Sequence, residues 1–179
     1  MAHTSGDRLS ALRHAPVWRK PAVGKVKINV DAAYCATTGA APIGVIAMDD
    51  DGLVLSGLAK CFNGNYNVGL AKAMTFHEGI QLAINRNWTD AQVEGDAINT
   101  GNELANPTMD MSTIDVQTEY DRQTLRNFKD IKIMYVNRLA NTVAHELAHH
   151  AIVLGTKIRF GMDSLNFIHD HVLKDAIND

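Results

Sequence analysis

Three consecutive strand-like segments followed by a helical segment constrain the fold of this 179-residue chain more than any other feature. Residues 25–31 (KVKINVD) alternate strictly between aliphatic and polar side chains, which is typical of a strand with one buried face. Two further apolar runs flank the dipeptide Asp51-Gly52, where glycine supplies the positive φ that a tight hairpin needs. The sequence therefore predicts three antiparallel strands at the start of the domain.

The hydrophobic period then changes to that of a helix over residues 68–88, where Met74, Ile80, Ile84 and Trp88 share one stripe. The elements expected after this helix are, in order, a strand at 89–96, helices at 98–105 and 110–128, a strand at 131–136 and a helix at 141–154 with Asn141 as N-cap and Gly155 as stop. This order predicts an α/β domain with a mixed sheet of about five strands.

Composition sets the limits of the chain's organisation. An apolar content of 46% suits one globular domain, expected at 18–155, with a flexible lead-in at 1–17 and a C-terminal extension, docked on the domain, at 156–179. No apolar run reaches the length of a membrane span, so we expect an intracellular protein, nuclear or cytoplasmic, without a membrane partner. Cys35 and Cys61 lack a CxxC spacing and are expected to be reduced.

Charge patterning argues against a strong non-specific nucleic-acid binder. The formal net charge is −3, and basic and acidic residues are mixed throughout the chain. Three basic residues near the first strand, Arg19, Lys25 and Lys27, fit either a charged solvent face or a contact with phosphate. They do not form a basic stripe. The net charge favours a protein partner over a nucleic acid.

Two aspartates, Asp31 and Asp96, come at the ends of predicted strands. If the first and fourth strands pair in parallel through a right-handed crossover, both carboxylates lie at the same edge of the sheet. Converging carboxylates of this kind can hold a pair of magnesium ions for phosphodiester cleavage. A lone aspartate at a strand end is more often the cap of a turn or helix. The interpretation as a metal site therefore depends on the two aspartates lying together.

Five segments in order, VKINVDAA, GVIAMDDDG, LAKAMTFHEGIQLA, VEGDA and VNRLANTVAHELA, resemble the plant ribonuclease H-like family related to non-LTR retrotransposon domains. The resemblance spans residues 18–152 and extends to the later segment FIHDHV. It implies a ribonuclease H-like fold with helices on both faces of the sheet, and Mg²⁺- or Mn²⁺-dependent cleavage of the RNA strand of RNA–DNA hybrids. It further implies that Asp31 and Asp96 are catalytic metal ligands and that His145 occupies the last acidic position.

One position departs from this family. The family pattern resembles AEALALREGLQLA, whereas this chain reads AKAMTFHEGIQLA, so that Lys72 stands where the catalytic glutamate is expected. Lys72 shares a helical stripe with Phe76, which predicts that it faces the sheet, beside Asp31 and Asp96. We expect its ammonium to pair with these carboxylates and to weaken magnesium binding greatly.

Neither nearby glutamate is expected to replace the missing ligand. Glu78 is six residues beyond Lys72, about 240° further around the helix, and should face away from the site. Glu94 lies about 6.6 Å behind Asp96 along its strand and could at best orient another ligand.

A second motif, HELAH, gives an alternative. His145 and His149 on one helical face, with Glu146 between them, have the HExxH spacing of a zinc peptidase. The longer HExxHxxGxxH pattern fails at Ile152 and Gly155, and no glutamate follows Glu146 as a third ligand.

Three functions therefore remain open at this point. The leading one is a ribonuclease H-like protein with a degenerate active site, which binds nucleic acid or a protein without efficient cleavage. The second is a working magnesium-dependent hybrid ribonuclease that uses Asp31, Asp96 and His145. The third is the zinc peptidase.

Overall fold

The computed structural model describes residues 16–64, 66–97, 113–128, 130–155, 157–163 and 166–177. The elements are β1 (Val26–Ala32), β2 (Ala41–Met48), β3 (Val54–Phe62), α1 (Val68–Asn85), β4 (Ala91–Gly95), α3 (Thr113–Asn127), β5 (Ile131–Tyr135), the 3₁₀ helix η1 (Arg138–Ala140), α4 (Thr142–Leu154), β6 (Ile158–Phe160) and α5 (Asn166–Ile177). Most of the expected lead-in, residues 1–15, and the expected helix at 98–105 lie outside the described residues.

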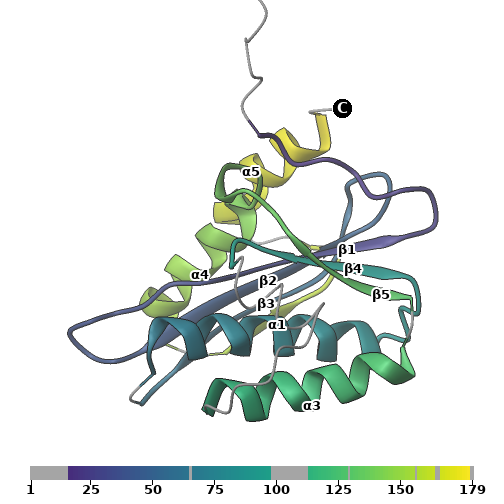
Figure 1. Ribbon diagram of the computed structural model, residues 1–179. Helices are drawn as coiled ribbons and strands as arrows, with labels where there is room; N and C mark the ends of the chain where they lie inside the picture. The colour runs from purple at the N-terminus through teal and green to yellow at the C-terminus, as the bar shows by residue number, and fades with distance from the viewer. Residues whose placement is uncertain are drawn as a thin grey trace, which may run out of the picture.

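The strands form one mixed sheet in the order β5-β4-β1-β2-β3-β6. β1 pairs with β2 in antiparallel fashion and with β4 in parallel. Helices α1 and α3 lie on one face of this sheet and α4 and α5 on the other (Figure 1). The expected α/β architecture is confirmed. The sheet has six strands rather than five, because β6, from the expected C-terminal extension, pairs with β3.

Helix α1 packs closely against the middle of the sheet. The Asn67 side chain accepts a 2.7 Å hydrogen bond from the Leu70 amide and caps its first turn. Phe76 and Ile80 are buried, whereas Met74, Ile84 and Trp88 of the predicted stripe are only half-buried. The most buried face of the helix is therefore the one that contains Phe76, which the sequence predicted to face the sheet, while Ile84 and Trp88 pack at the edge of the same core. The small residues Ala71, Ala73, Gly79 and Ala83 are buried as well.

Helix α4 covers the other face, where Ile46 and Met48 of β2 are buried against it. The two elements approach so closely at Gly44 that a Cβ there would overlap the carbonyl oxygen of Ala144. The helix ends as predicted at Gly155, whose φ of 61° is left-handed. Asn141 precedes the helix, but its side chain does not cap it and instead donates a 2.9 Å hydrogen bond to the Val30 carbonyl.

The polar face of β1 is buried, which corrects the interpretation of Lys27 as a solvent-facing or phosphate-contacting residue. The Lys27 ammonium lies 3.1 Å from a Glu94 carboxylate oxygen, and both side chains are only 8% exposed. Trp18 donates a 2.8 Å hydrogen bond to Asn29 in the same layer. The polar residues of this strand are buried because partners distant in the sequence satisfy their hydrogen-bonding groups.

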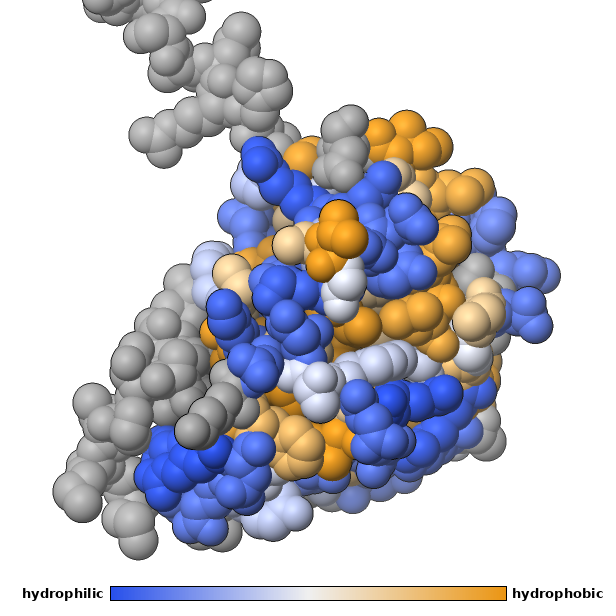
Figure 2. All heavy atoms as spheres, turned by 90° about the vertical axis from the view of Figure 1, so that its right-hand side faces the viewer, coloured by the Kyte–Doolittle hydropathy of each residue, from blue (hydrophilic) through white to orange (hydrophobic). Residues whose placement is uncertain are grey.

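The surface seen in Figure 2 shows hydrophobic areas interspersed with hydrophilic ones. Among the described residues, no helix combines the length and the hydrophobicity needed to cross a bilayer.

Substitution of Gly44 tests the packing of α4 on β2. The Gly44→Ala variant should lose about 1–3 kcal/mol of unfolding free energy, because the added methyl group meets backbone atoms of α4 that cannot move independently. Gly161→Ala is the matched control, since no atom lies within 4 Å of a Cβ built there. Urea denaturation measures both variants. Equal stability of the two variants would contradict the close approach.

Candidate functional site

The C-terminal ends of β1 and β4 bring the two predicted aspartates to one cavity. Parallel pairing sets Val30 opposite Gly95, so that Asp31 and Asp96, the next residue on each chain segment, are neighbours. Both line a cavity of about 350 Å³, to which α1 contributes Lys72, η1 contributes Arg138 and α4 contributes His149. The spatial meeting expected from the sequence is thus observed.

Lys72 forms an ion pair inside this cavity. Its Nζ lies 3.1 Å from Asp96 Oδ1, and the two side chains are 27% and 14% exposed. The ammonium therefore occupies the space beside a carboxylate that was expected to bind a metal. The expected second pairing, with Asp31, is not among the contacts that the structure shows for the described residues.

Asp31 is held by a different partner. His145 Nδ1 lies 2.7 Å from Asp31 Oδ2, and the Ala32 amide donates to Oδ1 at 2.9 Å. Burial of the carboxyl group raises the pKa of Asp31, the nearby charge of Asp96 raises it further, and the hydrogen bond from His145 opposes both effects. The negative charge of Asp31 is therefore destabilised by its burial in the site.

His145 has a second charged neighbour besides Asp31. Arg138 Nη2 lies 3.2 Å from Nε2 and 3.4 Å from Nδ1 of its ring. The imidazole therefore lies between the Arg138 guanidinium and the Asp31 carboxylate. The His149 ring packs edge-on at a centroid distance of 4.3 Å. Sequence reasoning did not find Arg138, because a single arginine in a three-residue 3₁₀ helix has no periodic signal.

These residues do not fit the pair of magnesium ions that the family resemblance implies. Magnesium takes oxygen ligands, whereas Lys72 places an ammonium beside Asp96, and Asp31 is bonded to His145. Within the described part of the chain, no group of three or more histidine, cysteine, aspartate or glutamate side chains is arranged to hold a metal ion. Zinc at His145 would have to displace a partner from one of its two nitrogens.

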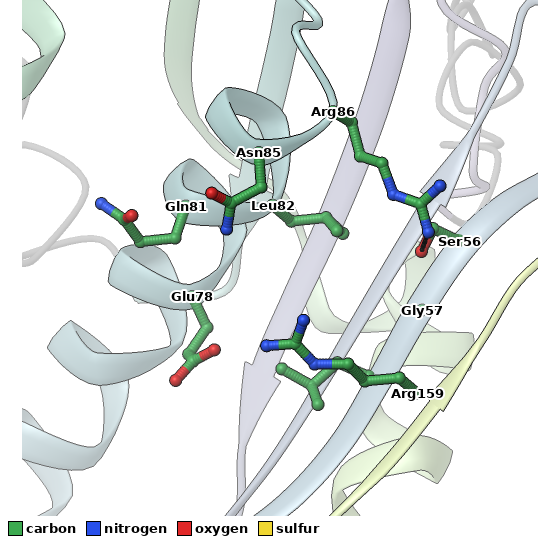
Figure 3. A pocket seen from close by; sticks show the side chains of 9 residues that line it. Ser56, Gly57, Glu78, Gln81, Leu82, Asn85, Arg86 and Arg159 are labelled. Atoms are coloured by element: carbon green, nitrogen blue, oxygen red, sulfur yellow. Dashed lines mark hydrogen bonds between the residues drawn. The ribbon is translucent and has the colours of Figure 1, made fainter.

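The two other glutamates lie outside this cavity. Glu78 faces away from it, as expected, and forms a 2.8 Å ion pair with Lys60. It lines a separate cavity of about 90 Å³ near the C-terminal end of α1, together with Arg86 and Arg159 (Figure 3). Glu94 is occupied by Lys27. Neither glutamate replaces the carboxylate missing at Lys72.

Comparison with known proteins identifies the family. Residues 29–151, more than half of the chain, match the model of a family described as reverse transcriptase-like. The chain belongs to the reverse transcriptase-like family. No curated protein sequence matches this reverse transcriptase-like chain at a significant level.

Solved structures show that this reverse transcriptase-like domain has a ribonuclease H-like fold. RNase H1 from Halobacterium salinarum is 21% identical with a TM-score of 0.65, covering 73% of this chain and 98% of its own. The N-terminal RNase H domain of a Mycobacterium tuberculosis protein, solved as a fusion with maltose binding protein, is 23% identical with a TM-score of 0.64, covering 73% and 94%. LC11-RNase H1 in complex with an RNA/DNA hybrid is 15% identical with a TM-score of 0.65, covering 73% and 98%.

The raised pKa of Asp31 predicts a specific dependence of stability on pH. Because the folded protein holds this proton to higher pH than the unfolded chain, the contribution of Asp31 to the unfolding free energy falls as pH rises above about 4. An asparagine does not titrate. The stability of Asp31→Asn relative to the unmodified protein should therefore increase with rising pH.

Urea denaturation between pH 3 and pH 8 measures this difference. Glu119→Gln is the control of opposite sign, because hydrogen bonds from Gln123 and Arg122 lower the pKa of Glu119. A relative stability of Asp31→Asn that decreases with rising pH would contradict the buried, costly carboxylate.

Proposed function

We propose that this domain binds nucleic acid of the RNA–DNA hybrid class at the cavity between Asp31 and Asp96 and cuts it inefficiently or not at all. The observation that carries the proposal is the 3.1 Å ion pair between Lys72 and Asp96. This ion pair supports a site that keeps two aspartates at the position of a nuclease centre but lacks the excess negative charge needed to bind metal ions.

Metal-assisted cleavage needs an excess of negative charge in the protein. Two divalent ions clamp the attacking and leaving oxygens of a phosphodiester, and carboxylates hold those ions. A lysine in place of a glutamate changes the local charge by two units and removes one ligand. The remaining carboxylate of the pair, Asp31, already accepts hydrogen bonds from His145 and Ala32.

Two considerations support a nucleic-acid partner. The family and the fold are shared with RNase H proteins, one of which was solved with an RNA/DNA hybrid. The cavity also presents Lys72 and Arg138, two cations of the kind that contact phosphate oxygens. The overall charge of −3 argues for a local contact rather than an extended basic surface.

A cleavage assay on a labelled RNA–DNA hybrid with Mg²⁺ or Mn²⁺ tests the proposal. The natural protein should be inert or nearly so, whereas Lys72→Glu should cut at least about 100-fold faster, because the restored carboxylate removes the competing ammonium and adds a metal ligand. The double variant Lys72→Glu with Asp31→Asn is the matched control and should be inert again.

Cleavage by the natural protein that disappears in Asp31→Asn would overturn the proposal and establish a working hybrid ribonuclease. If the natural protein neither cuts nor binds the hybrid, the proposal also fails. The protein partner favoured by the net charge then becomes the better candidate.

A further inference from the structure

The cations of the cavity at Asp31 and Asp96 are more exposed than its carboxylates. Asp31 and Asp96 have side chains that are 3% and 14% exposed, whereas the side chain of Lys72 is 27% exposed. Arg138 is also exposed. A ligand that enters the cavity of about 350 Å³ therefore meets an ammonium and a guanidinium more readily than a carboxylate oxygen.

The charges of this cavity also balance. The two carboxylates that line it are matched in number by an ammonium and a guanidinium. A glutamate at position 72 would instead leave the carboxylates in excess, so that an entering phosphate would be repelled until divalent cations arrived. With Lys72, this electrostatic barrier is absent.

Donor capacity remains on both cations. An ammonium has three N–H donors and a guanidinium has five. Among the described residues, Lys72 donates one side-chain hydrogen bond, to Asp96, and Arg138 contacts only the His145 ring through Nη2. Both groups can therefore donate charge-assisted hydrogen bonds to a phosphate without breaking the contacts that hold them in place.

From these observations we infer that the cavity binds a backbone phosphate of nucleic acid directly through Lys72 and Arg138, with no divalent cation. This inference rests on the proposed function and specifies its chemistry: Lys72 supplies in the protein itself the positive charge that a bound metal would otherwise bring to the phosphate. Binding is then independent of Mg²⁺, and one ionic contact of the complex belongs to Lys72.

Fluorescence anisotropy of a labelled RNA–DNA hybrid tests this, in EDTA and in Mg²⁺ at matched ionic strength. The Kd of the natural protein should agree within about 2-fold between the two buffers. Lys72→Gln should weaken binding in EDTA by roughly 3- to 10-fold and reduce the slope of log K against log salt concentration by about one. Lys72→Glu should weaken it further in EDTA and make binding improve when Mg²⁺ is added.

Lys25→Gln is the matched control. The Lys25 side chain has the same 27% exposure, but it does not line the cavity and precedes β1 at the N-terminal end of that strand. Both carboxylate oxygens of Asp90 accept hydrogen bonds from its ammonium at 2.8 Å, so the structure assigns it a protein partner in place of the phosphate contact considered from the sequence. Its affinity for the hybrid should equal that of the natural protein. Inorganic phosphate, added as a competitor, distinguishes the source of the ligand. Loss of hybrid binding at low phosphate concentrations indicates a site for free phosphate and contradicts the inference, whereas hybrid binding that persists indicates a site for backbone phosphate.

The outcomes separate this inference from the proposed function. Hybrid binding that requires Mg²⁺, or equal affinities of Lys72→Gln and Lys25→Gln, would overturn direct binding by Lys72 and leave a non-cutting hybrid binder in place. An absence of hybrid binding in both buffers would overturn both. Metal-independent binding that weakens in Lys72→Gln alone supports the inference.

Discussion

The parallel pairing of β1 with β4 determines where the charged side chains of this domain meet. The connection between these strands runs through α1, which packs so closely that a Cβ at Gly79 would lie 2.8 Å from Val30 Cγ1. On β4, a Cβ at Gly95 would lie 2.7 Å from Phe76 Cζ. Because the helix cannot move outwards without losing this contact, the residue at position 72 is held over the strand ends whatever its charge. The close packing of α1 therefore decides the location of the site, and the side chain at position 72 decides its chemistry.

Magnitudes indicate which consequence of Lys72 matters more. Its ion pair with Asp96 is partly exposed to water, and pairs of that kind contribute about 1 kcal/mol or less to stability. The loss of a carboxylate ligand and the gain of a cation act together on a divalent ion, for which charge and oxygen ligands provide most of the affinity. By these magnitudes the ion pair of Lys72 contributes little to the stability of the fold, and the weaker metal binding that we propose is its larger consequence.

The sequence predicted those parts of the structure that depend on local periodicity. Alternation located β1 and hence Asp31, and the strand–helix order placed Asp96 beside it. Prediction from the sequence failed where a residue's partner is distant in the chain. Lys27 lies on the polar side of the alternating pattern and was expected to face solvent, but Glu94 and the Trp18 segment bury it. The three-residue strand β6 is too short to show a period, and its pairing with β3 depends on a contact about 100 residues away.

The histidine at position 145 and the lysine at position 72 change the site in the same direction. Compared with acidic side chains at both positions, the lysine and the histidine together remove two negative charges and add one positive charge. His145 Nδ1 lies 2.7 Å from the buried Asp31 carboxylate, while Lys72 pairs with Asp96. Each carboxylate thereby receives a protein partner, although burial still raises the pKa of Asp31. A carboxylate that the protein itself satisfies does not need a metal ion to be tolerated in the folded state, so Lys72 and His145 act in the same way on the two carboxylates.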